Sequence, residues 1–573
     1  MKRLLGYFKG YGKESIFAPL FKMLEAIFEL LVPLAISNII DNGIKRGEPK
    51  TVWGMIGIML ALAVIGLVCA ICAQFFAAKA AVGVSTKLRS SLFEKTQALS
   101  LPQSDAIGTS TLITRVTGDI NTVQTGINLF LRLFMRSPFI VFGAMIMAFT
   151  INVRLALIFV ITIAILSIIV FGIMLISIPL YKKVQGGVDG VVVKTRSNYR
   201  GTRVIRAFNR QEQEISEFDE KHNILTKFQL FAGKISALMN PLTYIVINVA
   251  VIILIKQGAI TVDSGKITQG ELVALYNYMT QILVELIKLA SLIITLNKSM
   301  ASLHRINSVF ETPSVIYPSA DKDSSDDPAT VKFENVSFKY SSGSDSAISN
   351  ISFSAAKGEK IGIIGGTGSG KSTVINLIPG FYYPTQGNVF IDGKNTILCD
   401  TEELRGKIGI VPQKAELFSG SIRSNLSFKN ENATEEELWT ALNYAQADTF
   451  VKQKDGQLDH PVSQNGANFS GGQKQRLTIA RALVGQPDIL IFDDSSSALD
   501  YATEAALKKA IDNLPWNPTV FIVSQRASSV IDADLIIVLD DGNIVGMGKH
   551  NDLLQNCVIY REIYESQFGG DEK

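Results

Sequence analysis

Long apolar runs dominate the first half of the chain. Six stretches reach the roughly 20 mostly apolar residues that a helix needs to cross the hydrocarbon core of a bilayer. They cover about residues 16–40, 53–77, 129–150, 154–180, 237–259 and 271–297. We therefore predict six membrane-spanning helices, and the short gap between the third and fourth predicts a tight hairpin around residues 151–154.

The connections between these runs differ in length and charge. Residues 78–128 and 181–236 form long connections that carry many lysines and arginines, whereas the other connections are short. Because basic residues accumulate on the cytoplasmic side of a membrane, we expect both long connections and both termini in the cytoplasm. Apolar positions recur at helical spacing in them, which predicts helices that extend beyond the bilayer and break at Gly108 and Gly201. The basic segment 1–15 predicts a helix at the membrane surface.

The pattern changes after residue 312. Residues 313–330 are rich in Pro, Ser and Asp, a composition typical of a linker. Beyond them, short Ile- and Val-rich strands alternate with helical segments, which predicts an α/β domain with a largely parallel sheet. The predicted strands are VKFENVSFKY, EKIGIIGG, KIGIVPQ, DILIFDD, TVFIVSQ and LIIVLDDG. The chain is thus divided into a transmembrane domain (1–312), the linker (313–330) and a second domain (331–573).

Composition agrees with one membrane domain joined to one soluble domain. Hydrophobic residues make up 47% of the chain and charged residues only 19%. The net charge of +3 gives no reason to expect nucleic-acid binding. Cys69 and Cys72 form a CxxC pair inside the second apolar run. We interpret them as two small residues of a membrane span, because neither a second pair nor a histidine cluster accompanies them as in a redox or metal site.

A glycine-rich loop carries the strongest chemical signal. It follows the apolar strand IGII, precedes a predicted helix, and fits the phosphate-binding P-loop pattern in full. Its residues are Gly365, Gly366, Thr367, Gly368, Ser369, Gly370, Lys371 and Ser372, followed by Thr373. The backbone N–H groups would wrap the phosphates of a nucleotide, Lys371 would reach the β- and γ-phosphates, and Ser372 would ligate Mg²⁺. Asp493, at the end of the apolar strand ILIFD, would hold the shell of the same ion.

A second glycine turn indicates the class of nucleotide-binding protein. Phe469-Ser470-Gly471-Gly472-Gln473 precedes the helical run KQRLTIARAL and resembles the signature of ATP-binding-cassette (ABC) proteins, usually Leu-Ser-Gly-Gly-Gln. Alone, the turn could equally be a serine-capped helix start. As an ABC signature, it would donate N–H groups and the Ser470 hydroxyl to a γ-phosphate.

The resemblance extends to further motifs in the expected order. It implies that Tyr340 stacks on adenine and that Gln413 senses and ligates Mg²⁺. The D-loop of the family would correspond to Ser497, Ala498, Leu499 and Asp500. Six spans before one such domain form the layout of an exporter half-transporter. Residues 198–210 resemble the second intracellular coupling helix, which would dock on the ATP-binding domain of a partner chain, although Ser197 stands where the family usually has Glu.

Two residues depart from the family at the positions that perform hydrolysis. Asp494 stands where the family has the Glu that polarises water, and Gln525 stands where it has the switch His. Neutral drift is one interpretation. We favour a site that binds ATP but hydrolyses it slowly, as in the degenerate subunit of bacterial heterodimeric multidrug exporters. Its signature turn would then complete the active site of a second half-transporter that carries Glu and His.

The charges inside the spans allow two interpretations of the substrate path. Lys22, Glu25 and Glu29 share one face of the first span. They form either an acidic patch that favours cationic amphiphiles or an internal Lys22–Glu25 pair, and Glu285 and Lys288 pose the same question. We expect a multi-pass protein of the cell membrane that exports amphipathic drugs with ATP and Mg²⁺. A lipid or peptide exporter and a nucleotide-gated channel or regulator are the alternatives.

Overall fold

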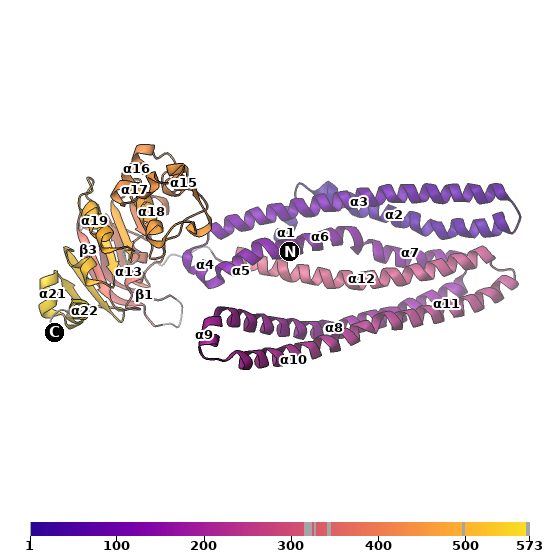
Figure 1. Cartoon of the computed structure of the whole chain (residues 1–573). Coiled ribbons are helices and arrows are strands. Elements are labelled where there is room, and N and C mark those ends of the chain that lie inside the picture. Colours follow the sequence, from indigo (N-terminus) through magenta and orange to yellow (C-terminus); the bar gives the residue numbers. More distant parts are fainter. Residues whose placement is uncertain (1, 314–323, 326–327, 341–344, 496–498, 569–573) are drawn as a thin grey trace. The chain divides into compact units, whose positions relative to one another are not determined.

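The computed structural model describes residues 2–313, 324–325, 328–340, 345–495 and 499–568. The chain forms two compact units, whose elements are labelled in Figure 1. The first unit comprises Met1–Ala98 and Ile107–Thr312, and the second comprises Leu99–Ala106 and Pro313–Lys573. The short segment Leu99–Ala106 therefore groups with the second unit, although it lies between membrane-spanning helices in the sequence.

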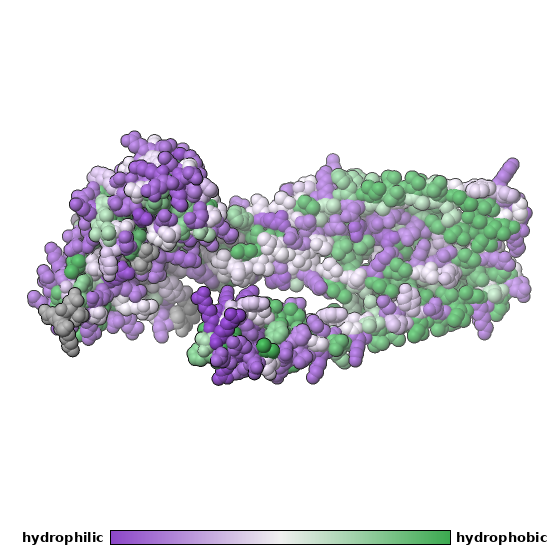
Figure 2. Space-filling view, in the orientation of Figure 1, coloured by the Kyte–Doolittle hydropathy of each residue, from purple (hydrophilic) through white to green (hydrophobic). Residues whose placement is uncertain are grey.

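The first unit is entirely helical, and π-helical turns join some of its helices into longer rods. Its helices are α1 (Lys2–Tyr7), α2 (Gly12–Asn38), α3 (Pro49–Gln97), α5 (Thr109–Thr114), α6 (Ile120–Leu129), α7 (Arg136–Ile151), α8 (Val153–Arg200), α9 (Thr202–Ala207), α10 (Gln211–Ala237), α11 (Met239–Asp263) and α12 (Gln269–Phe310). Among the residues that the structure describes, six rods are long and apolar enough to cross a membrane, which confirms the six predicted spans. Apolar residues gather over one end of these rods in Figure 2.

The breaks between helices follow local sequence. Helix α7 ends at Ile151, and the side chain of Asn152 then caps α8 by accepting hydrogen bonds from the N–H groups of Arg154 and Leu155 (3.0 and 3.2 Å), which explains the tight hairpin. Gly108 takes a left-handed φ of +83° between α4 (Leu101–Ile107) and α5, a conformation that favours glycine. Gly201 separates α8 from α9, so both predicted breaks are confirmed.

A polar contact joins the C-terminal end of α2 to the N-terminal end of α12. The carboxylate of Asp41, in the π-helical turn after α2, accepts hydrogen bonds from the Thr268 hydroxyl (2.5 Å) and the Gly270 N–H (3.0 Å). Thr268 also begins α12 through a capping box with Glu271. A Cβ on Gly270 would lie 2.3 Å from the Ser37 carbonyl oxygen, so glycine allows this close approach of the two helices.

The second unit contains two main sheets. The six-stranded sheet has the order β12-β11-β3-β10-β9-β6, in which only β12 runs antiparallel to its neighbour. The four-stranded sheet has the order β2-β1-β4-β5 and is antiparallel, and β7 pairs with β8. The strands are β1 (Val331–Phe338), β2 (Ile348–Ala355), β3 (Lys360–Gly365), β4 (Gln386–Ile391), β5 (Lys394–Asn395), β6 (Ile408–Val411), β7 (Gly420–Ser421), β8 (Pro461–Val462), β9 (Ile489–Asp493), β10 (Thr519–Ser524), β11 (Leu535–Asp540) and β12 (Asn543–Gly548).

The largely parallel sheet is confirmed, but the first predicted strand does not belong to it. VKFENVSFKY forms β1 of the antiparallel sheet, and its partner β2 was not predicted. The short connection between them explains the geometry, because a parallel pair needs a crossover of a dozen or more residues. Strand β2 alternates buried and more exposed positions, as expected of a strand that covers one face of a core.

Helices complete the second unit around three apolar cores. They are α4, α13 (Lys371–Leu377), α14 (Thr401–Gly406), α15 (Ile422–Leu426), α16 (Glu435–Tyr444), α17 (Asp448–Lys452), α18 (Gly471–Leu483), α19 (Tyr501–Asp512), α20 (Ala527–Val530), α21 (His550–Asn556) and α22 (Val558–Phe568). One core joins α13 to the facing sides of both sheets, and a second packs α15, α16 and α18 together. The third joins the end of β3 to α20, α21 and α22.

Candidate functional site

Four predicted site segments meet at one edge of the six-stranded sheet. Strands β3, β10, β9 and β6 are parallel neighbours, so their carboxyl ends lie at the same edge. The P-loop follows β3, Gln525 follows β10, Asp493 ends β9, and Gln413 follows β6. Ligands of open α/β sheets bind at this edge. The fold thus brings together residues that are up to 160 positions apart in the sequence.

The P-loop adopts a conformation that its glycines allow. Gly368 and Gly370 have left-handed φ angles of +85° and +96°. A Cβ on Gly370 would also lie 2.8 Å from the carbonyl oxygen of Ala347 and 2.6 Å from a methyl group of Ile348. Helix α13 begins directly after this loop, at Lys371. The backbone is therefore built for close approach of a phosphate rather than for side-chain packing.

Lys371 is buried within the loop. Its ammonium group donates hydrogen bonds to the carbonyl oxygens of Gly365 (2.9 Å) and Gly366 (2.5 Å) and to the hydroxyl of Ser369 (3.3 Å). Burial lowers the pKa of Lys371, while the nearby carboxylates of Asp494 and Asp493 oppose that shift. A partly desolvated cation of this kind pairs strongly with a phosphate anion.

Side chains with oxygen atoms that could ligate a metal ion lie close together near Lys371. The Ser372 hydroxyl donates to the Asp493 carboxylate (3.4 Å), and the side-chain amide of Gln413 donates to the Asp494 carboxylate (3.3 Å). Burial raises the pKa of Asp493, and the neighbouring charge of Asp494 adds to this effect. Hydroxyl, amide and carboxylate oxygens are the ligands that Mg²⁺ prefers, so Ser372, Gln413 and Asp493 fit the predicted magnesium site.

Asp494 is held in an uncommon backbone conformation. Its φ is +45°, in the left-handed region that few non-glycine residues occupy. Its N–H donates to the carbonyl oxygen of Val523 (2.9 Å), which fixes the end of β9 against β10. The backbone at the position of the usual catalytic Glu is therefore firmly placed, and the length of the side chain determines how far its carboxylate reaches.

Tyr340, the residue predicted to stack on adenine, contacts the P-loop helix. Its hydroxyl and the Thr373 hydroxyl form a hydrogen bond of 3.0 Å, and its half-exposed ring meets the rings of Phe338 and Tyr382 edge-on at 4.9 and 5.3 Å. The Tyr382 hydroxyl in turn donates to the carboxylate of Asp105 on α4 (2.7 Å). Sequence reasoning missed Tyr382 and Asp105, which are 277 positions apart.

The signature turn forms the start of α18. Ser470 caps this helix in a reciprocal capping box with Gln473, so the serine cap weighed as an alternative is present in the structure. Phe469 is buried against the core of α15, α16 and α18. Ser470 and Gly471 are exposed, and a Cβ on Gly471 would meet only open space. The first two small residues of the turn, Ser470 and Gly471, are thus accessible at the start of α18.

The D-loop lies only partly within the described residues. Ser497 and Ala498 fall outside them. Leu499 is buried, and the Asp500 side chain caps α19 by accepting a hydrogen bond from the Thr503 N–H (3.3 Å). Capping explains the type of residue at Asp500 without a contact to nucleotide.

Comparisons with known proteins agree with this geometry. Two family profiles match the chain, one for the ABC transporter transmembrane region over residues 15–286 and one for the ABC transporter family over residues 348–497. YfiB of Bacillus subtilis, an uncharacterized ABC transporter ATP-binding protein, is 34% identical over 99% of both chains. The chain belongs to the ABC transporter family. It has the layout of an exporter half-transporter, with the transmembrane region and the ATP-binding domain in one polypeptide.

Further relatives and one solved structure cover the whole length of this ABC transporter. An uncharacterized ABC transporter ATP-binding protein of Mycobacterium tuberculosis is 34% identical over 98% of this chain and 97% of its own. A putative export ATP-binding/permease protein of Rickettsia felis is 29% identical over 99% and 98%. A bacterial Atm1-family ABC exporter, solved with ATP bound, is 22% identical and superimposes with a TM-score of 0.81 over 99% of both chains, which shows a shared fold.

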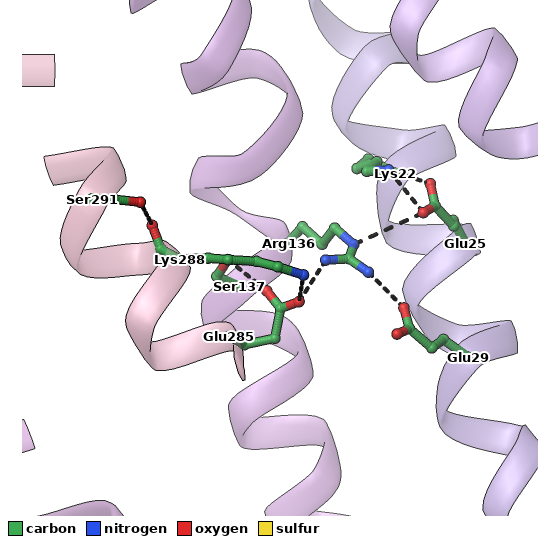
Figure 3. Close-up of polar contacts among 8 residues, drawn as sticks. All are labelled: Lys22, Glu25, Glu29, Arg136, Ser137, Glu285, Lys288 and Ser291. Carbon is green, nitrogen blue, oxygen red and sulfur yellow. Dashed lines mark hydrogen bonds and ion pairs between the residues drawn. The ribbon is translucent and has the colours of Figure 1, made fainter. Parts of the chain in front are cut away.

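The transporter holds a second group of polar residues between its membrane-spanning helices, shown in Figure 3. We call it the ion cluster. It consists of Lys22, Glu25 and Glu29 on α2, Arg136 and Ser137 on α7, and Glu285 and Lys288 on α12. Three carboxylates and three cations balance to zero charge. The cluster joins three helices that are far apart in the sequence.

Arg136 lies at the centre of the ion cluster. It donates to Glu285 (2.6 Å) and Glu29 (2.5 Å) and lies 4.0 Å from Glu25, with all three carboxylates around one guanidinium (Figure 3). Glu285 also accepts from the Ser137 hydroxyl (2.7 Å) and from Lys288 (2.9 Å). Only 7% of Arg136 and 3% of Glu285 is exposed. Buried charges persist when they are paired and hydrogen-bonded in this way.

The ion cluster bears on both interpretations of the first span. Lys22 and Glu25 do form an ion pair, with N–O distances of 2.5 and 2.7 Å. Glu29, by contrast, pairs with Arg136 across to α7, and 41% of its side chain is exposed. Sequence reasoning missed Arg136, although an arginine inside a predicted span is itself a signal of a buried partner.

Proposed function

We propose that this ABC transporter is one subunit of a heterodimeric exporter that moves amphipathic compounds such as drugs out of the cell by alternating access. The observation that carries the proposal is the contrast within its ATP site. The residues that would hold Mg²⁺ and ATP converge, whereas the two positions that would drive hydrolysis carry Asp494 and Gln525. Mg²⁺, when bound, supplies charge neutralisation at the β- and γ-phosphates.

The Asp494 side chain is one methylene shorter than the usual Glu. Its carboxylate therefore ends about 1.5 Å short of the expected place, from standard bond lengths. The left-handed backbone and the hydrogen bond to Val523 leave little freedom to make up that distance. A misplacement of about 1 Å can cost ~10²-fold in rate. Gln525 cannot exchange a proton as histidine does. This chain's own site should therefore bind ATP but hydrolyse it slowly.

The signature turn supports a role in a partner's site. Its exposed Ser470 and Gly471, at the start of a 13-residue helix, can donate N–H groups and a hydroxyl to a γ-phosphate held by another chain. Val204 on helix α9 and Phe208, directly after that helix, are likewise exposed between the long helices α8 and α10. These apolar side chains suit docking on the ATP-binding domain of the partner. The distribution of Lys and Arg supports a cytoplasmic position for this chain's ATP-binding domain and both termini, with the spans in the cell membrane.

An apolar groove beside the ion cluster supports an amphipathic substrate. It has a volume of about 580 Å³ and lies between α2 and α7, lined by side chains that include Met23, Ile27, Phe134 and Phe142. Glu29 lies on another face of α2 than Ile27, because residues two positions apart on a helix do not share a face, and 41% of its side chain is exposed. We propose that Glu29, with Glu25 one turn earlier, attracts the positive group of a cationic amphiphile, and that the groove is a separate site for apolar groups.

The test of subunit function compares the chain alone with the chain and its partner. In the complex we expect ATP-dependent uptake of dye into inside-out vesicles, with most turnover at the partner's P-loop. Replacing Asp494→Glu together with Gln525→His should then raise hydrolysis at this chain's site, by up to about 10²-fold if geometry alone limits it. Strong ATPase activity and dye transport by the chain as a homodimer would refute the heterodimer.

The test of the substrate path uses paired dyes. Glu29→Gln and Glu25→Gln should reduce export of a cationic dye more than export of a neutral dye of similar size, because the loss of the ion pairs with Arg136 and Lys22 affects both dyes equally, whereas the loss of charge attraction affects only the cationic one. Asp41→Asn, which alters a carboxylate outside the ion cluster, is the control. Equal export of both dyes by all three variants would exclude a substrate role for the two glutamates.

A further inference from the structure

The C-terminal helix makes two hydrogen bonds to the loop that carries Gln525. We call residues 525–527 the switch loop. The side-chain amide of Gln567, on α22, donates to the Gln525 carbonyl oxygen (2.8 Å) and accepts from the Ala527 N–H (2.8 Å). One amide group thus satisfies a backbone acceptor and a backbone donor two residues apart. This arrangement fixes the direction of the loop more firmly than a single bond would.

Packing beneath the switch loop reinforces this contact. Ala527 and Val530 of α20 are buried in one core with Tyr560 of α22 and with Ile364, which lies at the end of β3 directly before the P-loop. Ile563, one turn after Tyr560, packs against the same core. The C-terminal helix, the switch loop and the P-loop strand therefore share a single apolar contact surface.

A second element holds the loop from the other side. The carboxylate of Glu504, on α19, accepts from the Ser529 hydroxyl (2.9 Å) and lies 3.6 Å from the Arg526 guanidinium. The Arg526 N–H donates to the Ser524 hydroxyl (3.0 Å) at the end of β10. The backbone around Gln525 is therefore held by the Gln567 side chain, by the Ser524 hydroxyl at the end of β10, and by Glu504 through Arg526 and Ser529.

We infer that Gln567 is a positioning residue for the ATP site. It acts through the Gln525 backbone, whose orientation determines whether the Gln525 side chain reaches a γ-phosphate held by the P-loop. The C-terminal helix thereby sets how long ATP is retained. ADP lacks the γ-phosphate, so its retention does not depend on Gln567. The inference rests on the proposed role of this site as one that binds ATP but hydrolyses it slowly.

Two substitutions separate the two hydrogen bonds. Gln567→Leu removes both, whereas Gln567→Glu keeps an acceptor for the Ala527 N–H but cannot donate to the Gln525 carbonyl oxygen. Glu562→Leu changes an exposed residue of the same helix and serves as the control. The full-length transporter, with its partner, is reconstituted in lipid nanodiscs. Hydrogen exchange of the peptide that contains Ala527 and the dissociation rates of radiolabelled ATP and ADP are measured.

A lost hydrogen bond of ordinary strength changes an equilibrium about two- to tenfold. We therefore expect Gln567→Leu to speed exchange at Ala527 and ATP dissociation by about that factor, with ADP dissociation unchanged. Gln567→Glu should speed ATP dissociation but leave exchange at Ala527 near that of the unmodified protein. Glu562→Leu should change neither quantity.

Several results would overturn the inference. Equal acceleration of ATP and ADP release in Gln567→Leu would show a general structural role. If neither nucleotide dissociated faster, Gln567 would have no role in nucleotide retention. A normal exchange rate at Ala527 in Gln567→Leu would show that the hydrogen bond does not form. If the unmodified chain retained neither nucleotide, the proposed function would fail and the positioning role with it, whereas exchange at Ala527 would still report whether the contact exists.

Discussion

Removing the central arginine of the ion cluster should destabilise the helical unit strongly. Arg136→Met leaves Glu285 buried with only Lys288 and Ser137 as partners. Removing one partner of a buried ion pair costs about 3–5 kcal/mol. The remaining contacts of Glu285 place the loss at the lower end, about 3 kcal/mol. At roughly 2–4 °C per kcal/mol, the melting temperature should fall by roughly 6–12 °C.

A thiol-reactive dye can report this loss. Cys69 is buried on α3, so its reaction with the dye follows unfolding of the helical unit once the other three cysteines, Cys72, Cys399 and Cys557, are replaced by alanine. The double variant Arg136→Met with Glu285→Met should recover most of the melting temperature. It leaves no buried unpaired carboxylate, and Lys288 is 47% exposed and can reach water.

The control is an ion pair of the same unit that lies at its surface. Lys79 is 52% exposed and contacts Glu14 at 3.0 Å. Because exposed pairs contribute about 0–1 kcal/mol, Lys79→Met should shift the melting temperature by a few degrees at most. The reasoning is refuted if Arg136→Met is as mild as Lys79→Met, or if the double variant is no more stable than the single one.

Two further predictions concern the ATP-binding unit. Because burial raises the pKa of Asp493, its carboxylate protonates at a higher pH than an ordinary Asp. Mg²⁺-dependent ATP binding, titrated from pH 8 to pH 5, should therefore weaken earlier than an exposed Asp would allow, and Asp493→Asn should remove this dependence; identical profiles would contradict the assignment. Phe469→Leu should cost under about 1.5 kcal/mol and Phe469→Ala about 3–5 kcal/mol in thermal unfolding, because the ring is buried in the core of α18. Equal losses would show that the ring is not packed there.

The sequence predicted those parts of the transporter that depend on local pattern. The six spans follow from hydrophobic length, and the hairpin at Asn152 follows from a short polar gap between two apolar runs. The P-loop follows from glycine spacing, and the breaks at Gly108 and Gly201 follow from residue type. In each case the deciding interaction lies within a few residues of the signal.

The features that were missed depend on pairing across long distances. Strand β2 alternates in polarity, but nothing local indicates that it pairs with β1 rather than joining the parallel sheet. Arg136 meets partners 107 and 149 positions away, and its place at the centre of three carboxylates results from how three helices pack. Gln567 carries no motif at all, and only the fold places it beside the switch loop.

Helix α4 affects how a fragment of the ATP-binding domain should be chosen. All of this helix except its last residue lies in the segment Leu99–Ala106, which belongs to the ATP-binding unit although it is encoded between two membrane spans. There the Gln103 amide donates to the Pro313 carbonyl oxygen (2.6 Å), and Asp105 accepts from Tyr382. A soluble fragment cut at the linker would lack this helix and would leave the Tyr382 hydroxyl, next to Tyr340, without its Asp105 partner. Nucleotide affinities measured on such a fragment would describe an ATP-binding unit that lacks the native contacts of α4.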